Sequence, residues 1–108
     1  MPLPNDPAAE VRGAVAANRY RIGWHAVQHM FEEGFDVTAL LEALTGKLTV
    51  LERYEEDNRV LMLGEFHIAE KKTCPLHIVG DFPAAGCVDV VTAYIPSRPQ
   101  WASPRRRA

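Results

Sequence analysis

The sequence lacks most of the features that assign a small protein to a class at first sight. No apolar run approaches the roughly 20 residues that a membrane-spanning helix needs, so we expect no membrane association. A formal net charge of -2 excludes a strongly basic nucleic-acid coat protein. The chain also has no phosphate-binding glycine loop, nucleophile elbow or dinucleotide-binding fingerprint. Phosphate binding would therefore depend on a local cluster of basic side chains.

The N-terminal segment gives no sign of export. Met1–Ala9 is rich in proline and acidic, with neither the positive start nor the apolar middle of a signal peptide. We therefore expect a cytoplasmic protein. In that compartment the two cysteines, Cys74 and Cys87, are expected to be free thiols.

What the chain does contain is the composition of an ordinary globular domain. It is 47% hydrophobic and 24% charged, and its 108 residues suffice for one hydrophobic core. We divide it into an N-terminal extension with a helix (1–18), a single α+β domain (19–101) and a basic flexible tail (102–108). The tail carries Arg105, Arg106 and Arg107.

Three helices are predicted in the first half of the chain. Asp6 and Pro7 are a typical N-cap and first residue for a helix over 8–18. The helix predicted over 23–33 has an apolar stripe of Trp24, Val27 and Phe31, with Ala26 and Met30 beside it. Gly34 is expected to end that helix, and Asp36 to cap a third one that ends at Gly46.

The second half of the chain has the pattern of strands. Four strands are predicted, separated by short loops without helices, at Leu48–Tyr54, Val60–Ala69, Pro75–Val79 and Cys87–Ile95. Gly64 inside the second strand indicates a bulge or a close approach of another segment. Tyr20–Ile22 is expected to be a short extended link. The predicted fold is therefore α+β, with N-terminal helices packed on a four-stranded antiparallel meander.

Two histidine patterns raise the question of a metal. His25 and His29 share a helix face at the zincin spacing, but the glutamate that acts as base is missing, so a metalloprotease is not expected. His67, Cys74, His77 and Cys87 resemble a zinc set. Cys74 and His77 are three apart on one strand, however, and so point to opposite faces. We predict no metal site and no cofactor.

Several other side chains could serve RNA chemistry. His77 lies in a predicted strand, where it is either a hydrogen-bonded sheet residue or a rigidly held acid or base. Arg53, Tyr54 and Arg59 surround the first β-turn. Tyr94 and Arg98 end the last strand. Aromatic side chains beside arginines can stack bases and pair with phosphates, although they are also ordinary residues of sheet edges.

Three stretches together resemble a bacterial domain-of-unknown-function family. The family pattern runs "yri..HA..RM..RgI", "lvlG…plHvV" and "iiTvYePd…W", and it covers roughly Arg19 to Trp101 here. The matching stretches are Tyr20–Ile22 with His25, Ala26, Met30 and Gly34; Val60–Gly64 with Pro75–Val79; and Val91–Pro96 with Trp101. The chain departs at His29, where the family usually has arginine, and at Phe35, where it usually has isoleucine. The first departure removes a fixed positive charge.

That family is similar to the RelE/ParE/BrnT group of small toxins, in which two helices pack on a twisted antiparallel sheet. The resemblance implies a RelE-like fold and an mRNA-cleaving or ribosome-linked endoribonuclease that an antitoxin protein neutralises. The family's motif positions carry over to His25, Gly64, His77, Thr92, Tyr94 and Trp101.

Metal-independent RNA cleavage needs a base, an acid and cations that stabilise the charge on phosphorus. Under the ribonuclease hypothesis, His77 and His25 are the acid and base, and Arg53 and Arg98 stabilise charge. Tyr94, Arg98 and Arg59 are the nucleic-acid-binding residues, with Tyr94 stacking on a base. The catalytic set is then His77, His25 and Arg53.

Two alternatives stay open at this point. The chain has no basic groove, so it could be a non-catalytic module in which the sheet and the Trp101 segment bind a partner protein along an edge strand. It could also be a small metal- or ligand-binding domain that uses His25 and His29. The sequence leaves the substrate, the partner and the oligomeric state open.

Overall fold

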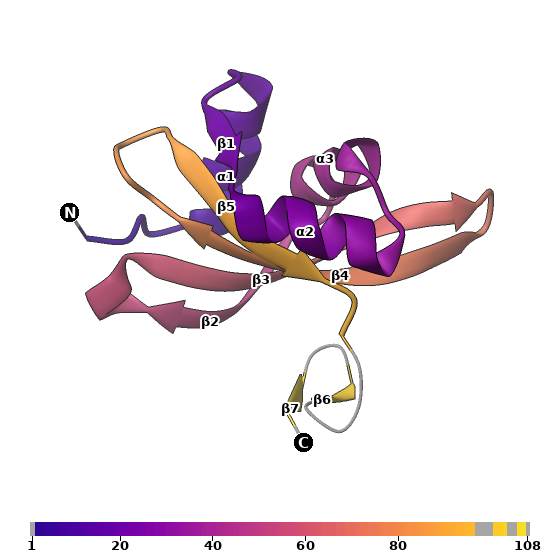
Figure 1. Cartoon of the computed structure of the whole chain (residues 1–108). Coiled ribbons are helices and arrows are strands. Elements are labelled where there is room, and N and C mark those ends of the chain that lie inside the picture. Colours follow the sequence, from indigo (N-terminus) through magenta and orange to yellow (C-terminus); the bar gives the residue numbers. More distant parts are fainter. Residues whose placement is uncertain (1, 97–100, 104–105, 108) are drawn as a thin grey trace.

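The structure, a computed structural model, describes residues 2–96, 101–103 and 106–107. Three helices, α1 (Pro7–Ala16), α2 (Trp24–Glu33) and α3 (Val37–Thr45), lie on one side of a five-stranded sheet (Figure 1). The strands are β1 (Tyr20–Ile22), β2 (Thr49–Tyr54), β3 (Arg59–Ala69), β4 (Lys72–Asp81) and β5 (Val88–Tyr94), and the 3-10 turn η1 (Glu55–Asp57) joins β2 to β3. A short ribbon of β6 (Trp101–Ser103) and β7 (Arg106–Arg107) lies on the other side of the sheet (Figure 1).

The sheet is mixed, which corrects the expected four-stranded antiparallel sheet. Its order is β1-β5-β4-β3-β2, and β1 pairs in parallel with β5 while the other neighbours are antiparallel. The supposed link is thus an edge strand. Hydrogen bonds from the Val88 amide to the Arg19 carbonyl (3.1 Å) and from the Gly23 amide to the Val90 carbonyl (2.8 Å) fix it. Three residues are too few for periodicity to identify a strand.

The helix ends follow the sequence signals. The Asp6 carboxylate accepts a hydrogen bond from the Ala9 amide at the start of α1, and Asp36 does the same for Ala39 at the start of α3. Gly34 ends α2 with a φ of 80°, in the left-handed region that glycine adopts without steric cost. The predicted starts of α1 and α3 and the predicted ends of α2 and α3 are thus confirmed, whereas α1 ends at Ala16 and not at the predicted residue 18.

The orientation of α2 differs from the expected one. Ala26 and Met30 are buried against the sheet, whereas Trp24 and Phe31 are 72% and 90% exposed and Val27 is also exposed. Two contacts set this rotation: the Gly23 amide bonds to β5 at the start of the helix, and the Glu33 carboxylate accepts from the Ile95 amide (2.6 Å) at its end. The small Ala26 lets the helix axis lie close to β5. The larger apolar stripe therefore faces away from the core.

Gly64 is a point of close approach between layers, as the sequence indicated. A Cβ added there would lie 2.9 Å from the Ala43 carbonyl oxygen of α3. The missing side chain thus lets α3 pack directly on β3.

The helix α1 belongs to the same core as the rest of the chain. Val11 is fully buried, and Leu3, Ala14 and Val15 join one cluster with side chains of α3 and the sheet. Within the described residues, no helix is both long and apolar enough to cross a membrane.

Candidate functional site

The register divides the sheet residues between two faces. One face carries the common core under the helices. We call the other the far face; it is crossed by rows of directly opposed residues whose side chains point away from the helices. The rows are Thr49–Leu63–His77–Tyr94, Glu52–Leu61–Val79–Thr92 and Tyr54–Arg59–Asp81–Asp89–Arg21. Four of the candidate RNA-chemistry residues, namely Tyr54, Arg59, His77 and Tyr94, therefore share this face.

His77 and Tyr94 are directly opposed on β4 and β5. Their rings meet edge to face, with centroids 5.3 Å apart and an angle of 68° between the planes. The Tyr94 hydroxyl oxygen lies 3.4 Å from His77 Nδ1. The question of whether the two residues share a face, which the sequence left open, is thus settled in favour of sharing.

The centre of the far face is closed to solvent. His77 is 0% exposed, and Leu61 and Leu63 beside it are buried. The Thr92 hydroxyl is buried without a hydrogen-bond partner among the described residues. A histidine in this position can contribute to the packing of the sheet. A substrate cannot reach it unless the far face rearranges.

A charged row crosses the end of the far face. Asp81 and Asp89 are directly opposed, and each is held by an arginine on its outer side. Arg59 donates to Asp81 over 2.7 and 3.0 Å, and Arg21 donates to Asp89 over 3.1 and 3.0 Å. The hydrogen bonds to Asp81 raise the pKa of Arg59. Because both cations are neutralised in this way, the row offers little net charge for phosphate.

The remaining predicted site residues are dispersed. Arg53 lies beside Val60, on the helix side of β2, where it pairs with Glu55 (2.7 Å) and reaches the Pro4 carbonyl (3.4 Å). His25 is exposed on α2 and lines a surface pocket that includes Asp81 and Asp89 but not His77. His77, His25 and Arg53 therefore do not line a common cleft.

The last of the predicted residues lie near the C-terminal end of the chain. Arg98 lies outside the described residues, as does part of the predicted tail 102–108. Trp101 begins β6.

The cysteine and histidine patterns do not assemble into a cluster. Cys74 is opposed to Phe66, a core residue, whereas His77 is opposed to Leu63 on the far face, so the two do point to opposite faces. Both cysteines are free thiols. Across the described ranges, no three side chains of His, Cys, Asp or Glu come together as a metal-ion site.

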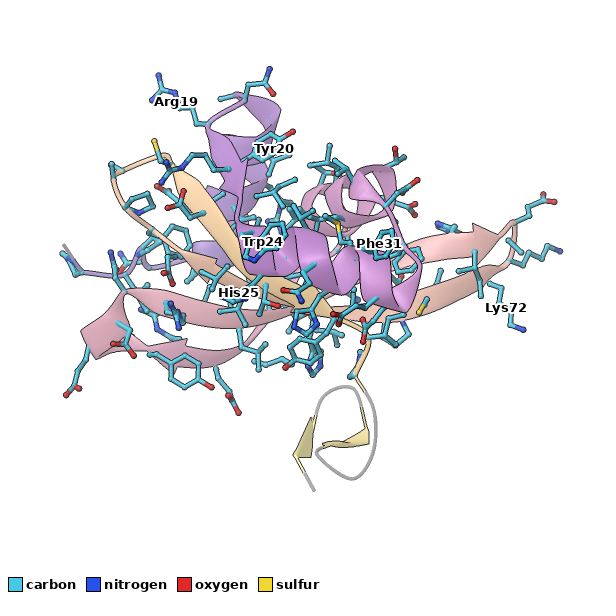
Figure 2. The ribbon with its side chains drawn as sticks, viewed as in Figure 1. Arg19, Tyr20, Trp24, His25, Phe31 and Lys72 are labelled. Carbon is cyan, nitrogen blue, oxygen red and sulfur yellow. The ribbon has the colours of Figure 1, made fainter. Side chains whose placement is uncertain are left out.

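Sequence reasoning missed one feature, an exposed apolar surface on α2. We call Trp24, Val27 and Phe31 the α2 face; the three follow one another at helical spacing and are all exposed. Figure 2 shows Trp24 near the start of α2 and Phe31 near its end. Val37 at the start of α3 is exposed as well. The adjacent Ala26 and Met30 were the signal that a second, smaller apolar stripe could face the sheet instead.

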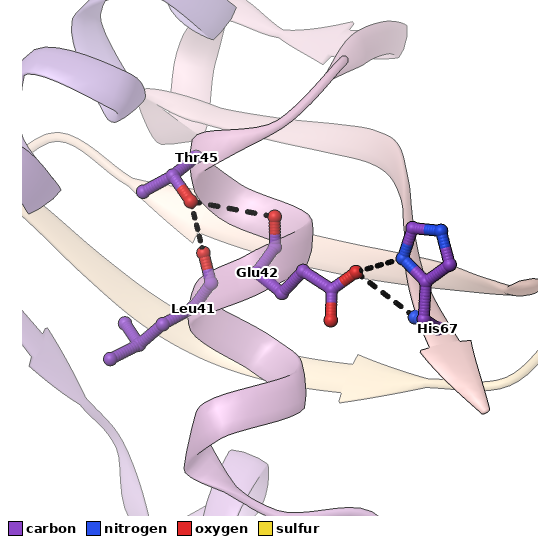
Figure 3. Close-up of polar contacts among 4 residues, drawn as sticks. All are labelled: Leu41, Glu42, Thr45 and His67. Carbon is purple, nitrogen blue, oxygen red and sulfur yellow. Dashed lines mark hydrogen bonds and ion pairs between the residues drawn. The ribbon is translucent and has the colours of Figure 1, made fainter. Parts of the chain in front are cut away.

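The chain segment that carries the α2 face is acidic. Residues 22–46 contain four carboxylates and neither lysine nor arginine. One of them, Glu42 of α3, is paired with His67 of β3, whose ring nitrogen Nδ1 lies 2.5 Å and whose amide nitrogen lies 3.0 Å from the same carboxylate oxygen (Figure 3). The contact with the His67 side chain, aided by its amide, lowers the pKa of Glu42.

Comparison of the chain with protein-family models, with curated proteins and with solved structures found no match in any of the three. The resemblance to the toxin group therefore stays a prediction, and the function has to be argued from the geometry.

Proposed function

We propose that the chain is a non-catalytic protein-interaction module that binds a partner protein through the α2 face. The observation that carries this proposal is the outward orientation of Trp24, Val27 and Phe31 on a helix that buries only Ala26 and Met30. Burial of an aliphatic or aromatic side chain contributes about 1.5–3 kcal/mol. A helix that leaves its larger apolar residues in water forgoes that stabilisation in the isolated chain, and a partner can recover it.

The alternative surfaces support the proposal less. The far face has its histidine buried and its arginines paired with aspartates. Of the two edge strands, β1 is only three residues long and offers few backbone groups to an added strand. The other, β2, is six residues long, but its register shift between Val50 and Glu52 interrupts the edge. Aromatic residues are frequent anchors of protein interfaces, and the α2 face presents two of them within two turns of helix.

A photocrosslinking amino acid at Gln28, beside the α2 face, tests the proposal in cells. We expect covalent adducts with a defined protein from this position and none from the same amino acid at Glu56 in the distant η1 turn. The captured protein is then purified and its affinity for the chain is measured. Phe31→Ala should weaken binding at least about tenfold, because Phe31 is an exposed anchor and not part of the core.

The matched control is Tyr54→Ala, which removes a partly exposed aromatic side chain from β2 on the far face. It should leave the affinity unchanged. Equal loss in the Phe31 and Tyr54 variants, or adducts from Glu56 alone, would contradict the assignment of the surface.

A second candidate, the RelE-like endoribonuclease, is favoured by the placement of His77, Tyr94 and Arg59 on one face of the sheet. In this proposal the far face opens on the ribosome, and His77 then transfers a proton. Purified chain is incubated with RNA, alone and with ribosomes, in the presence of a chelator. Cleavage that persists in a folded His77→Asn variant would rule out His77 as the acid or base.

A further inference from the structure

We infer that the occupant of the α2 face is an amphipathic helix whose apolar side is bordered by lysine and arginine. This inference rests on the proposed function and names the class of partner. It rests on the charge of the surface and on its shape. The charge also disfavours two other kinds of occupant.

The charge comes from carboxylates that no basic residue of the same segment balances. Glu32 accepts a hydrogen bond from the neutral Gln28 side chain (3.3 Å), and Asp36 accepts one from the Ala39 amide (3.0 Å). Glu33 accepts from the Ile95 amide. None of these three contacts brings in a positive charge. The end of the α2 face near Phe31 therefore has a negative border that lysine or arginine of a partner would complement.

The shape suits a helix with apolar residues two turns apart. Trp24 and Phe31 are separated by seven residues, which is about 10 Å along the helix axis. A pocket of about 450 Å³ opens beside Phe31 and is lined by Met30, Phe35, Ala39 and Phe66, with Asp36 and His67 also in its lining. One apolar side chain of the partner can enter this pocket while a second packs against Trp24. Helix-in-groove recognition has this pattern of anchors.

The same charge disfavours two other occupants of an apolar helix face. Helices that lie on membranes carry lysine and arginine beside their apolar side, and anionic lipids would repel the border of the α2 face. In a symmetric dimer, each copy would bring its own four carboxylates in residues 22–46. The arginine that lines a pocket with Trp24, Arg21, is already paired with Asp89. A basic partner avoids both costs.

The test uses the full chain and two synthetic helices of about 18 residues with the same apolar side. One is flanked by lysine and arginine and the other by glutamate. Binding is followed by amide chemical shifts and by isothermal calorimetry at two salt concentrations. We expect the basic helix to shift the amides of α2 and to bind at least about tenfold more tightly than the acidic one. Higher salt should reduce that difference.

Two pairs of variants separate the contributions. Phe31→Ala should weaken the basic helix at least about tenfold. The double variant Glu32→Gln, Asp36→Asn should weaken it about threefold or more, and asparagine keeps the N-cap of α3. Glu56→Gln, Asp57→Asn removes the same charge from the distant η1 turn and should change nothing.

Failure of the basic helix to bind overturns the inference, as does equal binding of the acidic helix. Self-association that Phe31→Ala abolishes would make a second copy the occupant. Binding to vesicles of phosphatidylserine would make it a membrane. If adducts form at Gln28 but the basic helix does not bind, the interaction module stands and only the inferred partner class falls. If no adducts form, the proposed function itself fails.

Discussion

The Tyr94 ring stands edge-on to the fully buried His77 ring, and its hydroxyl oxygen lies 3.4 Å from His77 Nδ1. This pair joins β4 to β5 on the face of the sheet that has no helices. Aromatic pairs of this geometry contribute about 0.5–1.5 kcal/mol beyond the area that they bury. Two of the positions that carry the family resemblance therefore pack against each other, and one of them, His77, is fully buried.

We predict that Tyr94→Phe lowers the free energy of unfolding by about 0.5–1.5 kcal/mol, because it removes the hydroxyl and keeps the ring. His77→Ala should cost more, about 2–4 kcal/mol, because it leaves a cavity in a closed region. Urea denaturation followed by circular dichroism measures both. A His77→Ala variant as stable as the parent chain would show that the far face is open in solution.

Substitution of two glycines by alanine should change the stability of the chain in opposite directions. Gly64→Ala places a Cβ 2.9 Å from the Ala43 carbonyl oxygen, so α3 must shift and the free energy of unfolding should fall by about 1–3 kcal/mol. Gly13→Ala adds a methyl group with nothing within 4 Å, inside α1. It should raise the stability by about 0.5–1 kcal/mol. Thermal melting of the two variants checks the prediction, and a neutral Gly64→Ala would contradict the close packing of α3 on β3.

The contact between Glu42 and His67 predicts that the stability of the chain depends on pH. The contact lowers the pKa of Glu42 from its ordinary value of 4.5, so its stabilising contribution is present above about pH 4.5 and is lost as the pH falls below it. Glu42→Gln should therefore lose less stability than the parent chain on acidification from pH 5 to about pH 3. Because the pair is exposed, the effect should be small. Denaturation at a series of pH values measures it, with Glu56→Gln as the control.

The two thiols should differ in reactivity. Burial, together with the charge of Glu33, raises the pKa of Cys74, so less of it is thiolate near pH 8. Cys87 follows the loop between β4 and β5 and lines an open pocket. We expect a chromogenic disulfide reagent to modify Cys87 faster. Kinetics on Cys74→Ala and Cys87→Ala variants assign the phases, and a faster Cys74 would contradict the burial.

Much of the local structure followed from the sequence alone. The caps at Asp6, Asp36 and Gly34 depend on side-chain chemistry and backbone freedom within one helical turn, so they can be predicted without a fold. Gly64 was identified because a glycine inside an apolar strand is unfavourable unless another segment comes close. The opposite facing of Cys74 and His77 followed from the two-residue period of a strand.

Only the tertiary structure decided the features on which the function depends. The pairing of β1 with β5 brings together Arg21 and Asp89, which are 68 residues apart in the sequence. No local sequence pattern indicates such a pairing. The shared face of His77 and Tyr94 depended on a register that the sequence left open. The outward turn of Trp24 and Phe31 depended on hydrogen bonds that the backbone of β5 and Ile95 make with the two ends of α2. A sequence determines which stripes of a helix are apolar, but the rotation of the helix against its neighbours determines which of them is buried.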